Sequence, residues 1–481
     1  MSFLTIAFAA FVTITVIAVH AVPSRARPPV LLAASLAFYA THGLGYLAIL
    51  IATTAATWYA ALLIEQAAAE ERKKTIMVSA VAALILLLCV FKLGGALAPS
   101  PKAAEAMKVD VVWRFVLPLG LSYYLFKLVA YLLEVYWGTL PAQRNLVSVG
   151  VYAAFFPQIV SGPIQRPGDF FAQLARVGRV DPADLATGLR RILIGFFKKI
   201  AIADRLGPAV AAVYSAPEAH SPLELLFAAY AFAFQLYADF SGLTDIALGL
   251  GLLFGIRGPE NFDLPFFARN LQEYWRRWHM SLTSWLADYL FTPLRLALRD
   301  FGQYGLAAAV FLNMVAVGVW HGFTGAYLAF GVFHGVALAT SVLTLKRRDT
   351  FFKTRPALAA VRKLAAPLLT FHLVVLGLIL FRAESVGHAV RYLSSIANGI
   401  MQPGHSRLRF VVPDMPPKLL VSLFALLLCM EAVNYAMRTP VVSTRFVALP
   451  RGVRWAMYYG LIVLTLAYSR FGESGFIYGQ F

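Results

Sequence analysis

The chain has few charged residues and almost no cysteine. Only 14% of its 481 residues are charged, whereas soluble globular proteins carry about 25%. Its two cysteines, Cys89 and Cys429, each lie in an apolar run, so we expect packed thiols in place of a disulfide or a lipid attachment site. The sequence also lacks a Cys and His cluster with zinc-ligand spacing, and we expect no metal. These shortages argue against a soluble fold and against one held together by disulfides or zinc.

Hydrophobic residues make up 60% of the chain, and apolar runs near or above the roughly 18 to 20 residues that a spanning helix needs recur along it. They predict an all-α polytopic membrane protein in which residues 1–481 form a single integral membrane domain. We expect roughly eleven crossings. The runs fall at residues 1–22, 29–42, 46–64, 75–92, 112–137, 222–238, 243–256, 305–320, 325–345, 365–381, 418–436 and 455–469.

The net charge of +18 comes from 42 Lys and Arg against 24 Asp and Glu. Basic loops orient membrane proteins and contact anionic lipid, so we expect contact with the bilayer and no binding of nucleic acid. A basic mouth for an anionic ligand is the alternative. Residues 1–22 precede Arg25 and Arg27, which predicts an uncleaved helix with its N-terminus outside; cleavage near residues 19–21 is the other interpretation.

Two segments are unlike plain spanning helices. Residues 155–167 are apolar but contain three prolines and a glycine, which predicts a re-entrant segment covered by protein. Residues 190–205 alternate basic clusters with apolar residues, which is typical of an interfacial helix.

Two tryptophan-histidine signatures stand in this apolar background. One runs from Trp275 to Ser281 and contains His279, and the other is Trp320-His321-Gly322. A histidine at membrane depth is costly unless it is hydrogen-bonded or reaches a wet cavity. Because imidazole changes charge near neutral pH, both histidines are candidates for moving a proton or holding a polar substrate, and a satisfied structural histidine is the alternative.

If residues 272–285 form one helix, His279 shares a face with Trp275. Glu273 and Arg277 are four residues apart in the order that favours an ion pair. The tryptophans and arginines of this segment could instead be ordinary interfacial residues.

Five other polar side chains interrupt apolar segments. For His334, in Phe333-His334-Gly335, a structural role is the favoured interpretation. Asp239 and Asp245 are expected to belong to a structural network, and the alternative is that they order an arginine or histidine across the bundle. Gln158 and Asn261 could line a cavity.

Several motifs together resemble a known family. They occur in the order found in bacterial membrane-bound O-acyltransferases, in the subgroup that contains alginate O-acetylase and relatives that acetylate cellulose or peptidoglycan or move D-alanine to teichoic acid. The motifs are Leu117–Tyr124, Phe156–Ile164, Tyr237–Gly242, Pro259–Phe262, Trp275–Ser281, Trp320–Gly322 and Phe476–Phe481. Phe126-Lys127 and Pro293–Leu296 depart from the subgroup pattern.

The resemblance implies a ring of transmembrane, re-entrant and interfacial helices around a thinned central tunnel. It implies that the two motif histidines are His279 and His321, with His321 as the catalytic base and His279 orienting a reactant. Other residues then have expected places along the substrate path. Tunnel residues are expected to be Trp275, Trp278, Gln158, Asp239, Asn261 and Trp320, and the donor phosphates are expected to meet Arg276 and Arg277.

We expect an O-acetyltransferase of the bacterial cytoplasmic (inner) membrane that binds no resident cofactor. Acetyl-CoA is the expected donor. The subgroup resemblance implies that a separate extracytoplasmic acetyltransferase passes the acetyl group on to an extracytoplasmic polysaccharide, and this chain has no Gly-x-Ser-x-Gly elbow that would do so itself. One alternative is D-alanyl transfer from an acyl-carrier protein to teichoic acid. The other is a membrane transporter that uses the same buried polar groups.

Overall fold

The computed structural model describes residues 5–97, 117–401, 410–411 and 415–469. The described residues form helices joined by turns and loops, and their only β-type pairing is an isolated antiparallel bridge between Phe262 and Trp278. The expected motif at Phe476–Phe481 and the start of the expected 112–137 span lie outside the described residues. An all-α architecture is therefore confirmed.

The chain divides into two compact units. Unit 1 comprises Met1–Ile192 and Thr244–Glu260, and unit 2 comprises Leu193–Leu243 and Asn261–Phe481. Helices α10 (Pro182–Phe196) and α12 (Pro222–Leu253) each contribute to both. A single integral membrane domain stays a prediction.

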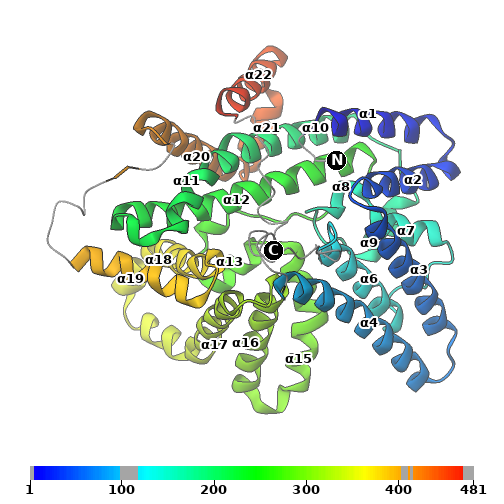
Figure 1. The fold of residues 1–481 in the computed structure, drawn as a ribbon, viewed down its shortest axis with the longest axis horizontal. Helices are drawn as coiled ribbons and strands as arrows, with labels where there is room; N and C mark the ends of the chain where they lie inside the picture. The colour runs from blue at the N-terminus through cyan, green and yellow to red at the C-terminus, as the bar shows by residue number, and fades with distance from the viewer. Residues whose placement is uncertain (1–4, 98–116, 402–409, 412–414, 470–481) are drawn as a thin grey trace, which may run out of the picture. The chain divides into compact units, whose positions relative to one another are not determined.

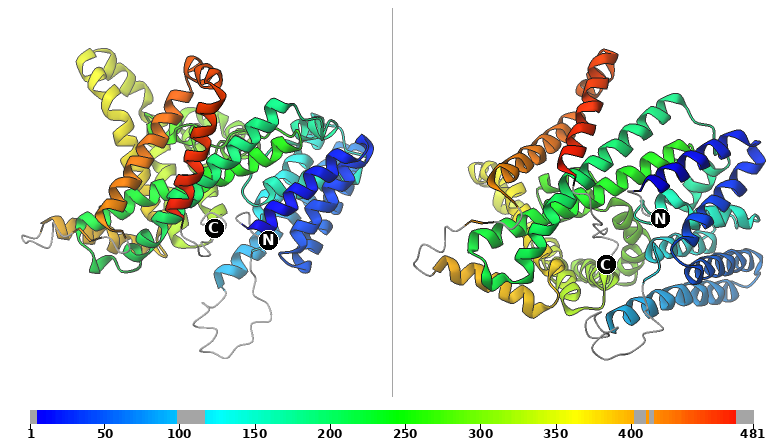
Figure 2. Two further views of the ribbon diagram at one scale, coloured as in Figure 1. Left: turned by 90° about the horizontal axis from the view of Figure 1, so that it is seen from above. Right: turned by 45° about the horizontal axis from the view of Figure 1, so that its top comes forward.

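Unit 1 holds the N-terminal helices. Figures 1 and 2 show α3 and α4 lying side by side, and α2 packs on α7. Leu31 and Phe38 of α2 are buried, since they lie on the face that α2 turns toward its neighbours. The helices are α1 (Ile6–Ala21), α2 (Arg27–Ala40), α3 (Leu44–Gln66), α4 (Glu70–Leu97), α6 (Leu121–Tyr136), α7 (Leu146–Ala154), α8 (Phe156–Ile159) and α9 (Pro167–Leu174).

Unit 2 holds the candidate histidines. Its most extensive helix pair is α16 with α17, and α17 also packs on α18 (Figure 1). The helices are α11 (Asp204–Ser215), α13 (Leu271–Arg277), α14 (Met280–Leu286), α15 (Thr292–Ala297), α16 (Gly302–His321), α17 (Gly325–Lys353), α18 (Pro356–Arg382), α19 (Val386–Met401), α20 (Pro417–Met437), α21 (Pro440–Ala448) and α22 (Arg451–Tyr468). The π-helical segment Phe197–Ala203 joins α10 to α11, and a second one, Ala287–Phe291, joins α14 to α15.

Seven helices of the described residues are long and apolar enough to cross a membrane, fewer than the roughly eleven expected. They are α3, α4, α12, α16, α17, α18 and α20, with bounds adjusted by a few residues at α4 and α16. The expected spans at 1–22, 29–42 and 112–137 correspond to helices of 14 to 16 residues. A polytopic membrane protein is confirmed.

One expected boundary is wrong. The sequence predicts two spans, 222–238 and 243–256, but the structure contains a single 32-residue helix, α12. Gly242 lies inside this helix, and its lack of a side chain lets α12 pack closely on α10, because a Cβ there would lie 2.8 Å from the Gly195 carbonyl oxygen. Of the most apolar 18-residue stretch of α12, 94% is buried, so this helix is surrounded by protein.

The two irregular segments also have their expected local form. Residues 155–167 form only the four-residue helix α8, followed by a turn and irregular chain up to α9, and they are almost entirely buried. Residues 190–205 are helical from α10 into the first π segment. Their re-entrant and interfacial positions stay predictions. Cys429 is exposed on α20, so of the two free cysteines only Cys89 is partly packed.

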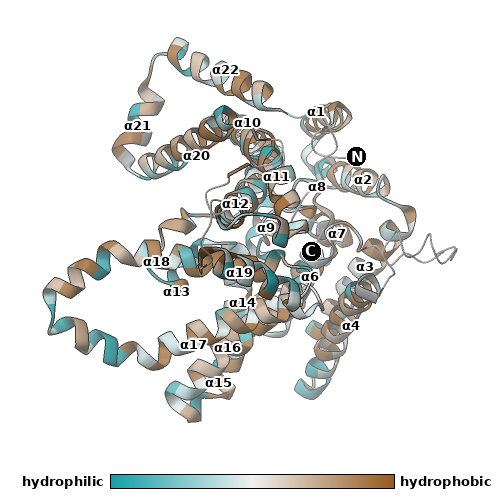
Figure 3. Cartoon of the chain, turned by 60° about the vertical axis from the view of Figure 1, so that its left-hand side comes forward, coloured by the Kyte–Doolittle hydropathy of each residue, from teal (hydrophilic) through white to brown (hydrophobic). Residues whose placement is uncertain are grey.

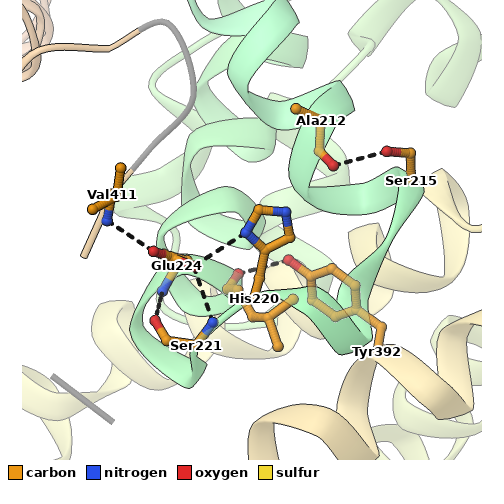
Figure 4. A network of polar contacts seen from close by, with 8 residues as sticks. Ala212, Ser215, His220, Ser221, Glu224, Tyr392 and Val411 are labelled. Atoms are coloured by element: carbon orange, nitrogen blue, oxygen red, sulfur yellow. Dashed lines mark hydrogen bonds and ion pairs between the residues drawn. The ribbon is translucent and has the colours of Figure 1, made fainter. Parts of the chain in front are cut away.

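The N-terminus of α12 is fixed by a capping box (Figure 4). The Ser221 hydroxyl accepts a hydrogen bond from the Glu224 amide (3.2 Å), and the Glu224 carboxylate accepts one from the Ser221 amide (3.0 Å). Glu224 also accepts from the Val411 amide (2.8 Å) and contacts Nδ1 of His220 (3.1 Å). The same carboxylate therefore starts the central helix and holds residue 411 against it.

Candidate active site

The segment around His279 is two short helices, so the expectation of one helix over 272–285 is wrong. α13 ends at Arg277, α14 begins at Met280, and His279 between them has a left-handed backbone with φ of +46°. Non-glycine residues in this region carry strain that the surrounding structure must offset. His279 therefore does not share a helical face with Trp275.

Asn261 supplies the contacts that hold this turn. Its carbonyl oxygen accepts a hydrogen bond from the Met280 amide (2.9 Å), and its side-chain Oδ1 accepts one from the Ser281 amide (3.2 Å). Beside it, the Asp263 amide donates to the Arg277 carbonyl (3.0 Å). Residues 261–263 thus replace the helical hydrogen bonds lost at the break. Asn261 is fully buried and acts here as a positioning residue for His279.

The His279 ring is buried between two aromatic side chains. It meets Phe240 of α12 edge-on with ring centroids 4.7 Å apart, and Trp320 of α16 at 6.2 Å. Only 1% of His279 is exposed, and this burial lowers the pKa of its imidazole to about 3. At neutral pH His279 is consequently a neutral ring that can donate one hydrogen bond and accept another.

His321 is the last residue of α16, and its ring lies 4.6 Å from that of Trp320. The rings of Phe381 (4.8 Å) and Tyr327 (6.1 Å) form the other walls around it. Trp320 is thus in contact with both motif histidines. Trp320 and His321 are neighbours in the sequence, and the structure brings His279 to the same indole.

Glycines bring α16 and α17 close enough to build this site. A Cβ on Gly318 would overlap the Tyr327 carbonyl oxygen, and a Cβ on Gly331 would lie 2.7 Å from the Met314 carbonyl oxygen. Small residues at such crossings let helix backbones approach closely in membranes. Because Gly318 precedes His321 by about one turn, this contact fixes where the imidazole sits.

His334 contacts the same set of rings from α17. The Trp275 Nε1–H donates to His334 Nδ1 (3.4 Å), and Phe330 lies 4.8 Å from the His334 ring and 6.2 Å from that of His321. An acceptor Nδ1 places the proton of the neutral ring on Nε2. His334 therefore fixes Trp275, as the structural interpretation expects. Its hydrogen bond with Trp275 could not be predicted from the sequence, because the two residues are 59 positions apart.

Asp239 lies in an ion-pair network, which agrees with the structural role favoured from the sequence. Its carboxylate lies 2.7 Å from Lys199 Nζ, and Asp204 lies 2.6 Å from the same nitrogen. Burial lowers the pKa of Lys199, but the two carboxylates more than offset this and raise it above its ordinary value. The network fixes α12 one residue before Phe240, the ring that packs on His279.

The remaining residues of the signature serve the local structure. Arg277 pairs with Glu273 as the sequence predicts, and Arg276 is exposed. Trp278 is buried in an aromatic cluster, with its ring 5.0 Å from Phe262. Arg276 is thus the more available of the two arginines proposed for donor binding.

Gln158 belongs to a buried cluster in unit 1. Its Oε1 accepts from Lys127 Nζ (3.0 Å), and its amide donates to Gln165 Oε1 (3.0 Å). The Gln165 amide in turn donates to the Arg257 carbonyl (3.1 Å). Lys127, where the sequence departs from the subgroup pattern, is only 2% exposed. A tunnel role for Gln158 stays a prediction.

Asp245 and Glu260 also bind within unit 1. Arg191 of α10 donates to Asp245 (2.8 Å) and to both oxygens of Glu260 (2.5 and 2.7 Å). A guanidinium shared by two carboxylates restrains the residue that immediately precedes Asn261.

Comparison with known proteins identifies the same region. Residues 140–380, half of the chain, match the family model for the membrane-bound O-acyltransferase (MBOAT) family. Similar proteins include the probable alginate O-acetylase AlgI of Pseudomonas putida, 37% identical over 58% of this chain and 55% of that protein. The peptidoglycan O-acetyltransferase of Helicobacter pylori is 29% identical over 60% of each chain.

A third relative is the teichoic acid D-alanyltransferase of Bacillus subtilis, which is 32% identical over 56% of this chain and 70% of that protein. The chain spans about half the length of the alginate O-acetylases it matches. Both motif histidines, Trp320 and Asn261 fall inside the matched residues.

Proposed function

Because this chain belongs to the membrane-bound O-acyltransferase family, we propose that it moves an acyl group from a thioester to a hydroxyl acceptor at the pair His279 and His321. The observation that carries this proposal is the contact of one indole, Trp320, with both imidazoles. Two histidines held at a fixed separation can divide the work of proton transfer and charge stabilisation between them.

In the proposed reaction, His321 accepts the proton of the attacking hydroxyl as its oxygen bonds to the thioester carbonyl carbon. The carbon–sulfur bond then breaks, and the His321 imidazolium returns the proton to the departing thiolate. His279 is neutral, so its N–H can donate to the carbonyl oxygen as negative charge develops there. The aromatic walls around both rings exclude water, which would otherwise hydrolyse the thioester.

For the substrates, we propose acetyl as the acyl group, acetyl-CoA as its donor and a polysaccharide outside the cytoplasmic membrane as its destination. Similarity to the alginate O-acetylases and to a peptidoglycan O-acetyltransferase supports this choice. A separate extracytoplasmic acetyltransferase completes the transfer in this proposal, since the sequence has no serine elbow. Exposed Arg276 is the proposed contact for the donor phosphates.

A second candidate is D-alanyl transfer from an acyl-carrier protein to teichoic acid. Similarity to the teichoic acid D-alanyltransferases, one of which is matched over 70% of its length, favours it. The two candidates share the thioester chemistry and differ in the donor.

The experiment is thiol release from acetyl-CoA by the full-length protein in nanodiscs, compared with His321→Ala and with His372→Ala. His372 is an exposed histidine of α18 that lies outside the site and serves as the matched control. We expect His321→Ala to lose at least a hundredfold in rate, since a general base contributes about 100-fold to 10,000-fold, and His372→Ala to keep it. Equal rates in all three proteins would refute the assignment of His321, whereas turnover only with a D-alanyl carrier protein would select the second candidate.

A further inference from the structure

A strongly basic surface lies at the turn between α17 and α18, far along the chain from both motif histidines. We name residues 346–363 the basic hairpin tip. It carries seven basic side chains against a single acid, Asp349; they are Lys346, Arg347, Arg348, Lys353, Arg355, Arg362 and Lys363. All except Arg348 are exposed, and the structure pairs none of the seven with a carboxylate within the described residues. Their charge is available for an anionic partner.

Two arginines of the basic hairpin tip are stacked on aromatic rings. The Arg355 guanidinium lies 4.1 Å from the Phe351 ring centroid, and the Arg362 guanidinium lies 4.4 Å from that of Phe352. Stacking holds each planar group in place. Nη1 of Arg355 also donates to the Phe351 carbonyl oxygen (3.3 Å) and to the Thr354 hydroxyl (3.2 Å), so its Nε and Nη2 are the N–H groups that can meet a phosphate. The tip can therefore form directed hydrogen bonds to phosphate oxygens in addition to attracting negative charge at long range.

The lengths of α17 and α18 determine how far the basic hairpin tip lies from the middle of the bilayer. α17 has 29 residues and α18 has 27, so they are about 43 and 40 Å long at 1.5 Å per residue. The hydrocarbon core of a bilayer is about 30 Å thick, and the headgroup layers bring it to about 40 to 45 Å. Figure 3 shows hydrophilic residues gathered where α17 passes into α18, at the end of two largely apolar helices. The tip thus reaches the level of lipid headgroups.

Exposed apolar side chains share the tip with the charges. Leu358 and Val361 of the tip are 48% and 62% exposed, and Leu364, directly after it in α18, is 84% exposed. A soluble acidic protein would leave these groups in water, whereas the boundary between headgroups and acyl chains accommodates both basic and apolar side chains. This combination favours a lipid surface over a protein partner.

We propose that the basic hairpin tip binds the phosphate headgroups of anionic phospholipids, with Arg355 and Arg362 as its main contacts. Clusters of four to eight basic residues next to a membrane span attract anionic lipid, and each adds about fivefold to the apparent affinity. The proposal depends on the membrane spans and is independent of the acyl-transfer reaction.

The test is native mass spectrometry of the detergent-purified full-length protein titrated with phosphatidylglycerol or with phosphatidylcholine. The variant Arg355→Gln with Arg362→Gln removes two charges from the tip. Its matched control, Arg72→Gln with Lys74→Gln, removes two exposed charges near the start of α4. We expect the tip variant to bind phosphatidylglycerol about 25-fold more weakly, at about fivefold per charge. The control and all phosphatidylcholine titrations are expected to stay within about twofold of the parent protein.

Unchanged phosphatidylglycerol binding by the tip variant, or an equal loss in the control, would overturn the proposal. So would binding of an acidic carrier protein at the tip with no preference for anionic lipid. If the tip variant misfolds, Lys346→Gln with Arg347→Gln removes two exposed charges from the other helix and must weaken phosphatidylglycerol binding as well. Arg362→Lys retains the charge without the planar stack and is expected to lose less than Arg362→Gln.

Discussion

Replacing His279 with alanine and, separately, with glycine tests the strained turn on which the candidate site is built. Both substitutions remove the imidazole, so both should abolish acyl transfer. They differ only in the Cβ atom, which alanine keeps in the left-handed conformation at φ +46° and glycine lacks. The difference in stability between the two variants therefore reports the backbone of residue 279.

The structure gives the sign and size of that difference. A Cβ in the left-handed region costs about 1 to 2 kcal/mol, and glycine avoids this cost. Glycine loses more conformational entropy on folding than alanine, which costs about 0.5 to 1 kcal/mol. The glycine variant should consequently be the more stable by about 1 kcal/mol. Both variants should be less stable than the parent protein, because removal of the ring leaves a cavity between Phe240 and Trp320.

The assay is unfolding of the purified variants in mixed micelles of dodecyl maltoside and increasing dodecyl sulfate. Ser284 provides the control, since it is exposed within α14, where the backbone is helical. There the order should reverse, with alanine more stable than glycine by about 1 kcal/mol. An alanine variant of His279 that is as stable as the glycine variant would show that residue 279 is not left-handed, and the account of how Asn261 holds the turn would fail with it.

Three further predictions follow from buried groups. Because the pKa of His279 is lowered, the unfolded state binds a proton below pH 6.5 that the folded state does not bind until about pH 3. The free energy of unfolding should therefore fall by about 2 kcal/mol between pH 7.5 and pH 5. His279→Gln should remove this pH dependence, and thermal melts with an unchanged pH dependence in the variant would contradict the prediction. Lys199→Met should cost about 3 to 5 kcal/mol by leaving Asp239 buried without its cation, and adding Asp239→Leu should recover much of it in a double-mutant cycle; additive costs would refute the coupling. Gly318→Ala forces a Cβ into a backbone carbonyl of α17 and should cost about 1 to 3 kcal/mol and most of the activity. Gly460→Ala, in α22 with open space around it, should keep the activity and raise the stability by up to about 1 kcal/mol.

Sequence patterns predicted the helices well where a single local cause decides them. Apolar length gave α3, α17 and α20 to within a few residues, except for the polar end of α17. The spacing of Glu273 and Arg277 gave their ion pair, because four residues are one helical turn.

Predictions failed where distant residues decide the backbone. The turn at His279 forms because residues 261–263 donate and accept the hydrogen bonds that a continuous helix would make, and nothing near residue 279 signals it. α12 contains Gly242 in its interior, and that position packs against the Gly195 backbone, which leaves no room for a Cβ. Both outcomes depend on partners 16 to 47 positions away, beyond the reach of local periodicity.

By itself the sequence determined the class of the protein and its family, and it made His279 and His321 the candidate histidines, since these follow from composition and from short motifs whose residues adjoin one another. Only the tertiary structure decided that one indole contacts both His279 and His321, that Asn261 positions a strained turn and that His334 holds Trp275. The physical reason is that burial, ring contacts and hydrogen bonds across helices form only when segments far apart in the chain pack together.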